Sequence, residues 1–117
     1  MFKLSLDRVL KSLVSLGISQ SDAEVYIYLA KEGPKKVGDL ANALELSRQQ
    51  LYLSLKKLRE KQIVKTSDDR PSIFSAIAFE EVIDLLIKIK KEQSASILET
   101  KKELLSSWKS ADWKNNT

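Results

Sequence analysis

The 117-residue sequence predicts a mainly α-helical fold that contains one short β hairpin. It is 43% hydrophobic and 31% charged, with only three Gly and two Pro, a composition typical of helix-rich globular domains. Along most of the chain the apolar residues recur at the spacing of a helix. Residues 63–77 depart from this spacing, because two short runs suited to strands flank a polar loop there.

The first helices are each bounded by a residue that favours a helix end. A helix over about 4–16 ends at Gly17, a good C-terminal cap. A second helix begins at a serine cap, Ser19 or Ser21, and stops at Gly33. A short third helix is marked by four apolar residues: Val37, Leu40, Ala41 and Leu44.

The fourth helix covers residues 47–61 and begins at Ser47, which can act as its N-cap. Leu51, Leu55 and Leu58 follow at helical spacing and define a buried stripe. The sequence therefore predicts an amphipathic helix directly after a tight turn.

The hairpin and the last helix complete the chain. Strands over 63–66 and 73–77 are joined by the polar loop 67–72. From Phe79 to about Trp108 the sequence has no Gly or Pro, which predicts one helix of about 45 Å at 1.5 Å per residue.

This order of elements predicts a winged helix-turn-helix, in which a three-helix core is followed by a two-stranded wing. The expected parts are a winged helix-turn-helix domain at 1–78, which includes the N-terminal helix, a long C-terminal dimerisation helix at 79–110, and a flexible polar tail at 111–117.

The composition also excludes several function classes. The chain has no Cys and no His, so thiol nucleophiles, imidazole bases and the usual zinc ligands are missing. We expect no enzyme activity, metal or cofactor. No apolar stretch approaches the roughly 20 residues that cross a bilayer, and the N-terminus lacks a clean signal-peptide core. The expected location is cytoplasmic, on the nucleoid, with no membrane contact.

The net charge is concentrated in one segment. Residues 47–61 carry +4, the same as the whole chain. A single acid, Glu60, stands against five bases: Arg48, Lys56, Lys57, Arg59 and Lys61. Such a stripe is typical of a polyanion-binding surface, and a solvated basic face is the alternative explanation.

Motifs in this order resemble the N-terminal winged-helix domain of the TrmB-like archaeal transcriptional regulators, from about Leu16 to Leu86. The matching residues are Leu16–Ser19, Ala23, Val25–Tyr26, Gly33–Pro34, Leu40–Ala41, Ser47–Arg48, Tyr52, Leu55, Leu58, Arg70–Pro71, Phe74, Ala76 and Glu80–Glu81. The resemblance implies a DNA-binding regulator.

Two departures from the family pattern fall at helix ends. Glu45 and Gln62 stand where the family commonly has Gly. If the backbone needs a positive φ there, each costs about 1 kcal/mol and could reshape the turn. Longer family members carry an effector-binding, often sugar-binding, domain after the linker helix. Because the sequence stops at residue 117, we expect no small-molecule sensing by such a domain.

The helix over 47–61 is the candidate recognition helix, since the second helix of a helix-turn-helix enters the major groove. Gln49 and Gln50 could match the adenine edge, while Arg48 could fork onto guanine or clamp a phosphate. Leu53, apolar on the outward face, could touch a thymine methyl group. Three further bases are better placed for phosphates: Lys56, Lys57 and Arg59.

Five positions around this face complete the predicted DNA-binding set. Ser47 is included at the cap, and Tyr52 is expected to be a core ring whose hydroxyl reaches a phosphate. Lys35 and Lys36, at the start of the third helix, could bind phosphate together with its N–H groups. Arg70 at the tip of the wing could enter the minor groove.

Alternatives to these DNA contacts stay open. Exposed glutamines are often simply good helix formers, and Leu53 could pack on the wing or on a partner. The two lysines before the third helix could form a solvated turn. Asp68 and Asp69, beside Arg70, would repel DNA.

The C-terminal part of the last helix predicts a partner. Five apolar residues lie beyond Lys91, out of reach of the winged domain: Ile97, Leu98, Leu104, Leu105 and Trp108. Two pairs among them are seven residues apart, the coiled-coil period. Left in water, each such side chain costs about 1.5–3 kcal/mol relative to burial. A homodimer through this helix is the simplest solution.

The sequence therefore favours a dimeric, sequence-specific regulator that binds double-stranded DNA. Two other functions remain in view. The winged helix could be a protein-interaction module whose basic face docks an acidic partner. It could also be a chromatin or architectural protein of low sequence specificity, because phosphate contacts alone suffice for binding.

Overall fold

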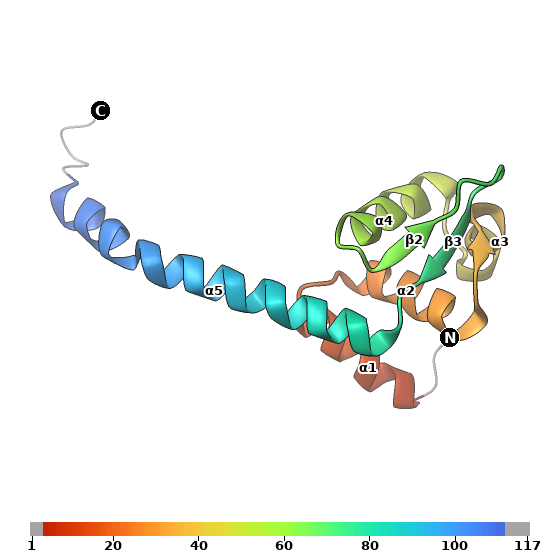
Figure 1. Ribbon diagram of the computed structural model, residues 1–117, viewed down its shortest axis with the longest axis horizontal. Coiled ribbons are helices and arrows are strands. Elements are labelled where there is room, and N and C mark those ends of the chain that lie inside the picture. The colour runs from red at the N-terminus through yellow and green to blue at the C-terminus, as the bar shows by residue number, and fades with distance from the viewer. Residues whose placement is uncertain (1–3, 112–117) are drawn as a thin grey trace. The chain divides into compact units, whose positions relative to one another are not determined.

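The computed structural model describes residues 4–111 and confirms a mainly helical winged fold (Figure 1). Its elements are α1 (Leu4–Ser15), α2 (Gln20–Glu32), β1 (Lys35–Lys36), α3 (Val37–Leu44), α4 (Arg48–Glu60), β2 (Val64–Thr66), β3 (Ile73–Ala76) and α5 (Phe79–Ser110). The chain forms two compact units, Met1–Leu86 and Ile87–Thr117. The flexible tail predicted at 111–117 lies outside the described residues, apart from Ala111.

The sheet has a strand that the sequence analysis missed. Its order is β1-β3-β2 and both pairings are antiparallel, so the predicted two-stranded wing is extended by β1 on the far side of β3. Lys35 pairs with Phe74 and Lys36 with Ile73. A Lys-Lys dipeptide has no strand propensity of its own, so its conformation is imposed by the free edge of β3.

Ser67 and Ile73 close the loop at the tip of the wing. The Ser67 N–H donates to the Ile73 carbonyl at 2.9 Å, and the Ile73 N–H donates to Ser67 Oγ at 2.9 Å. The two ends of the loop 68–72 are therefore held together at the edge of the sheet.

Three helices end in the same left-handed turn, although only one ends in glycine. The residues with positive φ are Gly17 (105°), Glu45 (55°) and Gln62 (64°). After each of them the next N–H donates to a carbonyl five residues back, as in a Schellman cap. These bonds join Ile18 to Leu13 at 3.1 Å, Leu46 to Ala41 at 3.1 Å and Ile63 to Leu58 at 2.9 Å. The turns at Glu45 and Gln62 thus keep the backbone form that suits glycine.

The core of the first unit draws on all of its helices and on the sheet. Its least exposed large side chains include Leu13, Tyr26, Leu29, Leu40, Leu51, Leu58, Ile63 and Leu86. The Tyr26 hydroxyl donates to the Ile77 carbonyl at 2.6 Å, and burial raises the pKa of Tyr26 to about 12. This bond fastens α2 to the segment that follows β3.

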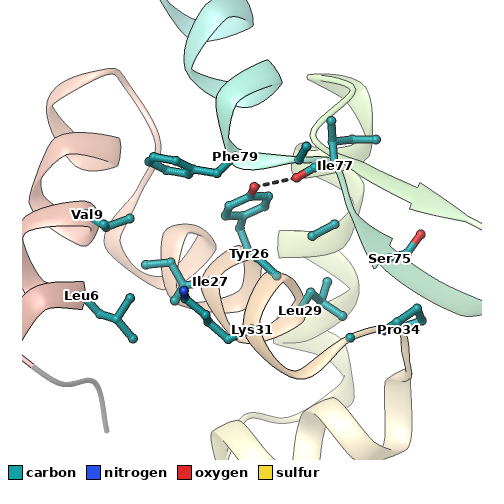
Figure 2. A pocket seen from close by; sticks show the side chains of 14 residues that line it. Leu6, Val9, Tyr26, Ile27, Leu29, Lys31, Pro34, Ser75, Ile77 and Phe79 are labelled. Carbon is teal, nitrogen blue, oxygen red and sulfur yellow. Dashed lines mark hydrogen bonds between the residues drawn. The ribbon is translucent and has the colours of Figure 1, made fainter.

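An apolar pocket of about 390 Å³ lies beside this bond (Figure 2). Leu6 and Val9 of α1 line it on one side, and Phe79 lies near the tyrosine hydroxyl. Lys31 is its charged lining residue. The pocket separates α1 from the junction of β3 and α5 within the first unit.

Candidate nucleic-acid interface

Helix α4 begins with a complete capping box. The Gln50 N–H donates to Ser47 Oγ at 3.1 Å, and the Ser47 N–H donates to Gln50 Oε1 at 3.1 Å. The Ser47 hydroxyl also lies 3.2 Å from Gln50 Oε1 and can donate to it. Ser47 was predicted as the cap, but the reciprocal role of Gln50 was not foreseen.

The capping box separates the two glutamines. Reading adenine uses both the oxygen and the nitrogen of one amide, whereas Gln50 Oε1 is engaged by Ser47. Gln49 is exposed, and its amide has no bond among the residues that the structure describes. Of the two glutamines, Gln49 is therefore the one whose amide oxygen and nitrogen are both open to a ligand.

The rest of α4 is amphipathic as predicted. Leu51, Leu55 and Leu58 are buried, and Ser54 joins them on the inner face. The exposed face carries Arg48, Gln49, Gln50, Tyr52, Leu53, Lys56, Lys57 and Arg59. All the basic side chains predicted on this helix are therefore available to a ligand.

Four of the predicted residues share one groove between α4 and the wing. Arg48, Tyr52 and Arg59 line it from the helix, and Arg70 lines it from the wing loop. The groove measures about 760 Å³ and includes the acidic Asp68 and Asp69. Gln49, Leu53, Lys56 and Lys57 do not line the groove, although they are exposed on the same helix.

One expectation about an individual position is corrected. Tyr52 is not a core ring, because 53% of its surface is exposed and its ring borders the groove. The residue that takes the inner position beside the leucine stripe is Ser54. Lys35 and Lys36 lie directly before α3 as predicted, where they form strand β1, and Lys36 is also the N-cap residue of α3.

Gly38 is a residue of the site that the sequence analysis overlooked. It lies in α3, and a Cβ placed on it would be 3.0 Å from Arg48 Nη2. A lone glycine inside a predicted helix was the available signal, since such a residue often marks a close approach of other atoms.

Comparison with known protein families decides the identity of this fold. A family model described as "Sugar-specific transcriptional regulator TrmB" matches residues 8–80, more than half of the chain. The chain belongs to the TrmB family. No curated protein matches the sequence.

Solved structures with the same fold accompany this TrmB assignment. A Methanosarcina mazei protein described as a "possible transcriptional regulator" has a TM-score of 0.63 at 21% identity, with 84% of this chain and 87% of that chain covered. The Sulfolobus tokodaii protein ST1889 has a TM-score of 0.61 at 23% identity, with 74% and 96% covered. The Thermotoga maritima transcriptional regulator Tm0710 has a TM-score of 0.55 at 24% identity, with 92% and 96% covered.

The TrmB assignment confirms two predictions from the sequence. The TrmB family is one of transcriptional regulators and not of enzymes, and the similar solved structures share the winged-helix fold of this chain. Within residues 4–111, none of the helices combines the length and apolarity required to traverse a bilayer.

Proposed function

We propose that this TrmB-family chain is a dimeric, sequence-specific DNA-binding regulator whose helix α4 enters the major groove. One observation carries the proposal: the inner face of α4 is fixed in the core, while its outer face presents exposed polar and basic side chains, isolated apolar ones and a single acid, Glu60. A helix held in this way can insert into the groove without unfolding any part of the domain.

The exposed face divides into reading and positioning groups. Gln49 and Leu53 are the proposed base contacts, because an amide matches adenine and an apolar side chain suits the thymine methyl group. Lys56, Lys57 and Arg59 provide phosphate contacts further along α4. Arg70, on the other side of the groove that Arg59 lines, provides the contact from the wing.

A second copy of the chain supplies the other half-site. In the second unit Ile97, Leu98 and Trp108 are 65%, 69% and 81% exposed, although they are large and apolar. Pairing of two α5 helices would remove these side chains from water. Two α4 helices related by a twofold axis would then bind a pseudo-palindromic site.

The test is fluorescence anisotropy of a labelled random-sequence duplex titrated with the full chain at two or more salt concentrations. We expect binding to weaken steeply with salt, because each phosphate contact releases counterions. Lys56→Ala/Lys57→Ala should bind more weakly and reduce the slope of log K against log salt by about 2, at about 0.9 per phosphate contact.

The matched control is Lys88→Ala/Lys102→Ala, which removes the same charge from exposed positions of α5. It should retain the affinity of the wild-type chain. Equal loss in both double variants would mean that net charge alone drives binding. No binding of the wild-type chain at low salt would contradict the DNA proposal and favour the protein-interaction function.

Sequence specificity needs its own measurement. Selection of bound duplexes from a random pool should enrich one motif, and Gln49→Ala should relax the preference at an A·T pair within it. A pool that stays random after selection would favour the architectural function instead.

A further inference from the structure

Arg48 does not extend freely from the start of α4 but lies against α3. A Cβ on Gly38 would be 3.0 Å from Arg48 Nη2 and 3.8 Å from Arg48 Cζ. The first of these separations is tighter than ordinary van der Waals contact. A side chain at residue 38 would therefore require the guanidinium to move by a few tenths of an ångström from its present place.

The backbone does not explain this glycine. The glycines with positive φ are Gly17 and Gly33, so Gly38 has a helical conformation open to any residue. Glycine is the poorest helix former after proline, and α3 has only eight residues. The close approach of the Arg48 guanidinium gives a physical reason for glycine at this position.

The place of the guanidinium selects one of the two roles open to Arg48. In a helix-turn-helix the first helix, here α3, crosses the DNA backbone, whereas base edges face the first half of α4. A guanidinium held over α3 thus faces phosphates. The N-terminus of a helix carries partial positive charge, which disfavours a cation in the first turn. A bound anion would offset this repulsion at Arg48.

We propose that Gly38 is a positioning residue that lets Arg48 lie across α3, and that Arg48 contacts a DNA phosphate rather than a base edge. The inference rests on the proposed DNA-binding function and deepens it. Arg48 then contributes to the affinity for DNA of any sequence. The preference for particular bases comes from the exposed side chains further along α4.

The first experiment is a double-mutant cycle with Gly38→Ala, Arg48→Ala and both together, using anisotropy on a labelled random-sequence duplex. Arg48→Ala should lower the affinity by about tenfold, as expected for loss of one charge-assisted hydrogen bond. Gly38→Ala should lower it by a smaller factor, about threefold, because the added methyl group shifts the guanidinium without removing it. In the Arg48→Ala background the same change should have no effect.

The control is Asn42→Ala, an exposed position of α3 that also gains helix propensity. It should bind like the wild-type chain. Gly38→Ala should melt no lower than wild type, since alanine favours the helix. A loss of affinity in Gly38→Ala then reflects the position of Arg48 and not the stability of α3.

The second experiment separates phosphate from base contact. Arg48→Ala should lose the same factor on a duplex of A·T pairs only and on a G·C-rich duplex, and its salt slope should fall by about 1. Loss confined to the G·C-rich duplex would show guanine reading and overturn the phosphate contact.

The remaining outcomes are also decisive. If the wild-type chain binds and Gly38→Ala binds equally well, the positioning role is overturned while the DNA-binding function stands. The same holds if Gly38→Ala weakens binding equally in the Arg48→Ala background. Absence of binding by the wild-type chain overturns the DNA-binding function, and the phosphate contact with it.

Discussion

At the scale of single residues, Tyr26 is the clearest case of one side chain holding separate parts of the fold together. It is 2% exposed, and its hydroxyl donates to the Ile77 carbonyl, 51 positions further along the chain. A buried hydroxyl must have a partner, and here the partner lies between the wing and α5. The ring fills the core while the hydroxyl fixes the exit of β3.

Removal of this hydroxyl should lower the free energy of unfolding. Tyr26→Phe keeps the ring but leaves the Ile77 carbonyl without its donor, at a cost of about 1–2 kcal/mol. Urea unfolding followed by circular dichroism measures the change. Tyr52→Phe is the matched control, because Tyr52 is 53% exposed and should change stability by less than about 0.5 kcal/mol. Equal effects of the two variants would contradict this role of Tyr26.

The same residue predicts a pH dependence in alkali. Burial raises the pKa of Tyr26 to about 12 in the fold, from its ordinary value of 10.0. Above pH 10 the unfolded chain therefore loses this proton first, and the stabilisation is lost as pH rises from 10 towards 12. Wild type should lose more stability over this window than Tyr26→Phe. Parallel loss in the two proteins would contradict the shift.

At the scale of elements, two helix ends have residues that are not the most favourable for their backbone conformation. Glu45 and Gln62 have φ of 55° and 64°, a conformation that L-residues with side chains adopt at a cost. Both turns keep their capping bonds in spite of that cost. The turn of the helix-turn-helix is thus held by its neighbours and not by the preference of its central residue.

Glycine at either position should stabilise the protein. Glu45→Gly and Gln62→Gly should each raise the free energy of unfolding by about 0.5–1 kcal/mol, since the positive φ is then free of strain. Gly17→Ala is the reverse control and should lower it by more than about 1 kcal/mol, because φ of 105° is strained for alanine. Thermal and urea unfolding test all three. Destabilisation by both glycine variants would show that the side chains contribute more than the strain costs.

Elements set by local chemistry could be predicted from the sequence. The cap at Ser47, the leucine stripe of α4 and the end of α1 at Gly17 follow from spacing and propensity, and the structure has them. Strand β1 could not be predicted, because its two lysines become a strand only through pairing with β3. Strand propensity is a property of single residues and does not report pairing with a strand that is distant in the sequence.

The candidate site shows the same division. Spacing identified the buried leucine stripe of α4, but not which of its exposed side chains are engaged by neighbours. The bond from Ser47 to Gln50 depends on rotamers, and the approach of Arg48 to Gly38 depends on how α3 crosses α4. The exposure of Tyr52 depends on a different packing, that of the wing beside α4, which leaves a groove at the tyrosine ring.

At the scale of the whole molecule, the part of α5 in the second unit has an apolar face that is exposed among the residues described, 4–111. Ile97, Leu98, Leu104, Leu105 and Trp108 are all exposed in the second unit. At about 100° per residue they fall within an arc of about 120°. One face of a helix with this much apolar surface is typical of a helix that pairs.

Charges on that face should separate the dimer. Ile97→Glu/Leu104→Glu places a carboxylate at two positions seven residues apart, where paired helices would bury them at high cost. Sedimentation velocity should show a dimer for wild type and a monomer for this variant. The matched control, Ala95→Glu/Ser106→Glu, adds the same charges on the opposite face and should remain a dimer. A monomeric wild-type chain at all concentrations would contradict pairing through α5.

The closed loop at the wing tip has a consequence for how this domain can change during evolution. Because two bonds between Ser67 and Ile73 seal the base of residues 68–72, substitutions or insertions at the tip do not disturb the sheet beneath it. Asp68, Asp69 and Arg70 can thus be exchanged independently of the core. A lineage could retune the electrostatic character of its wing while keeping the same scaffold and the same recognition helix.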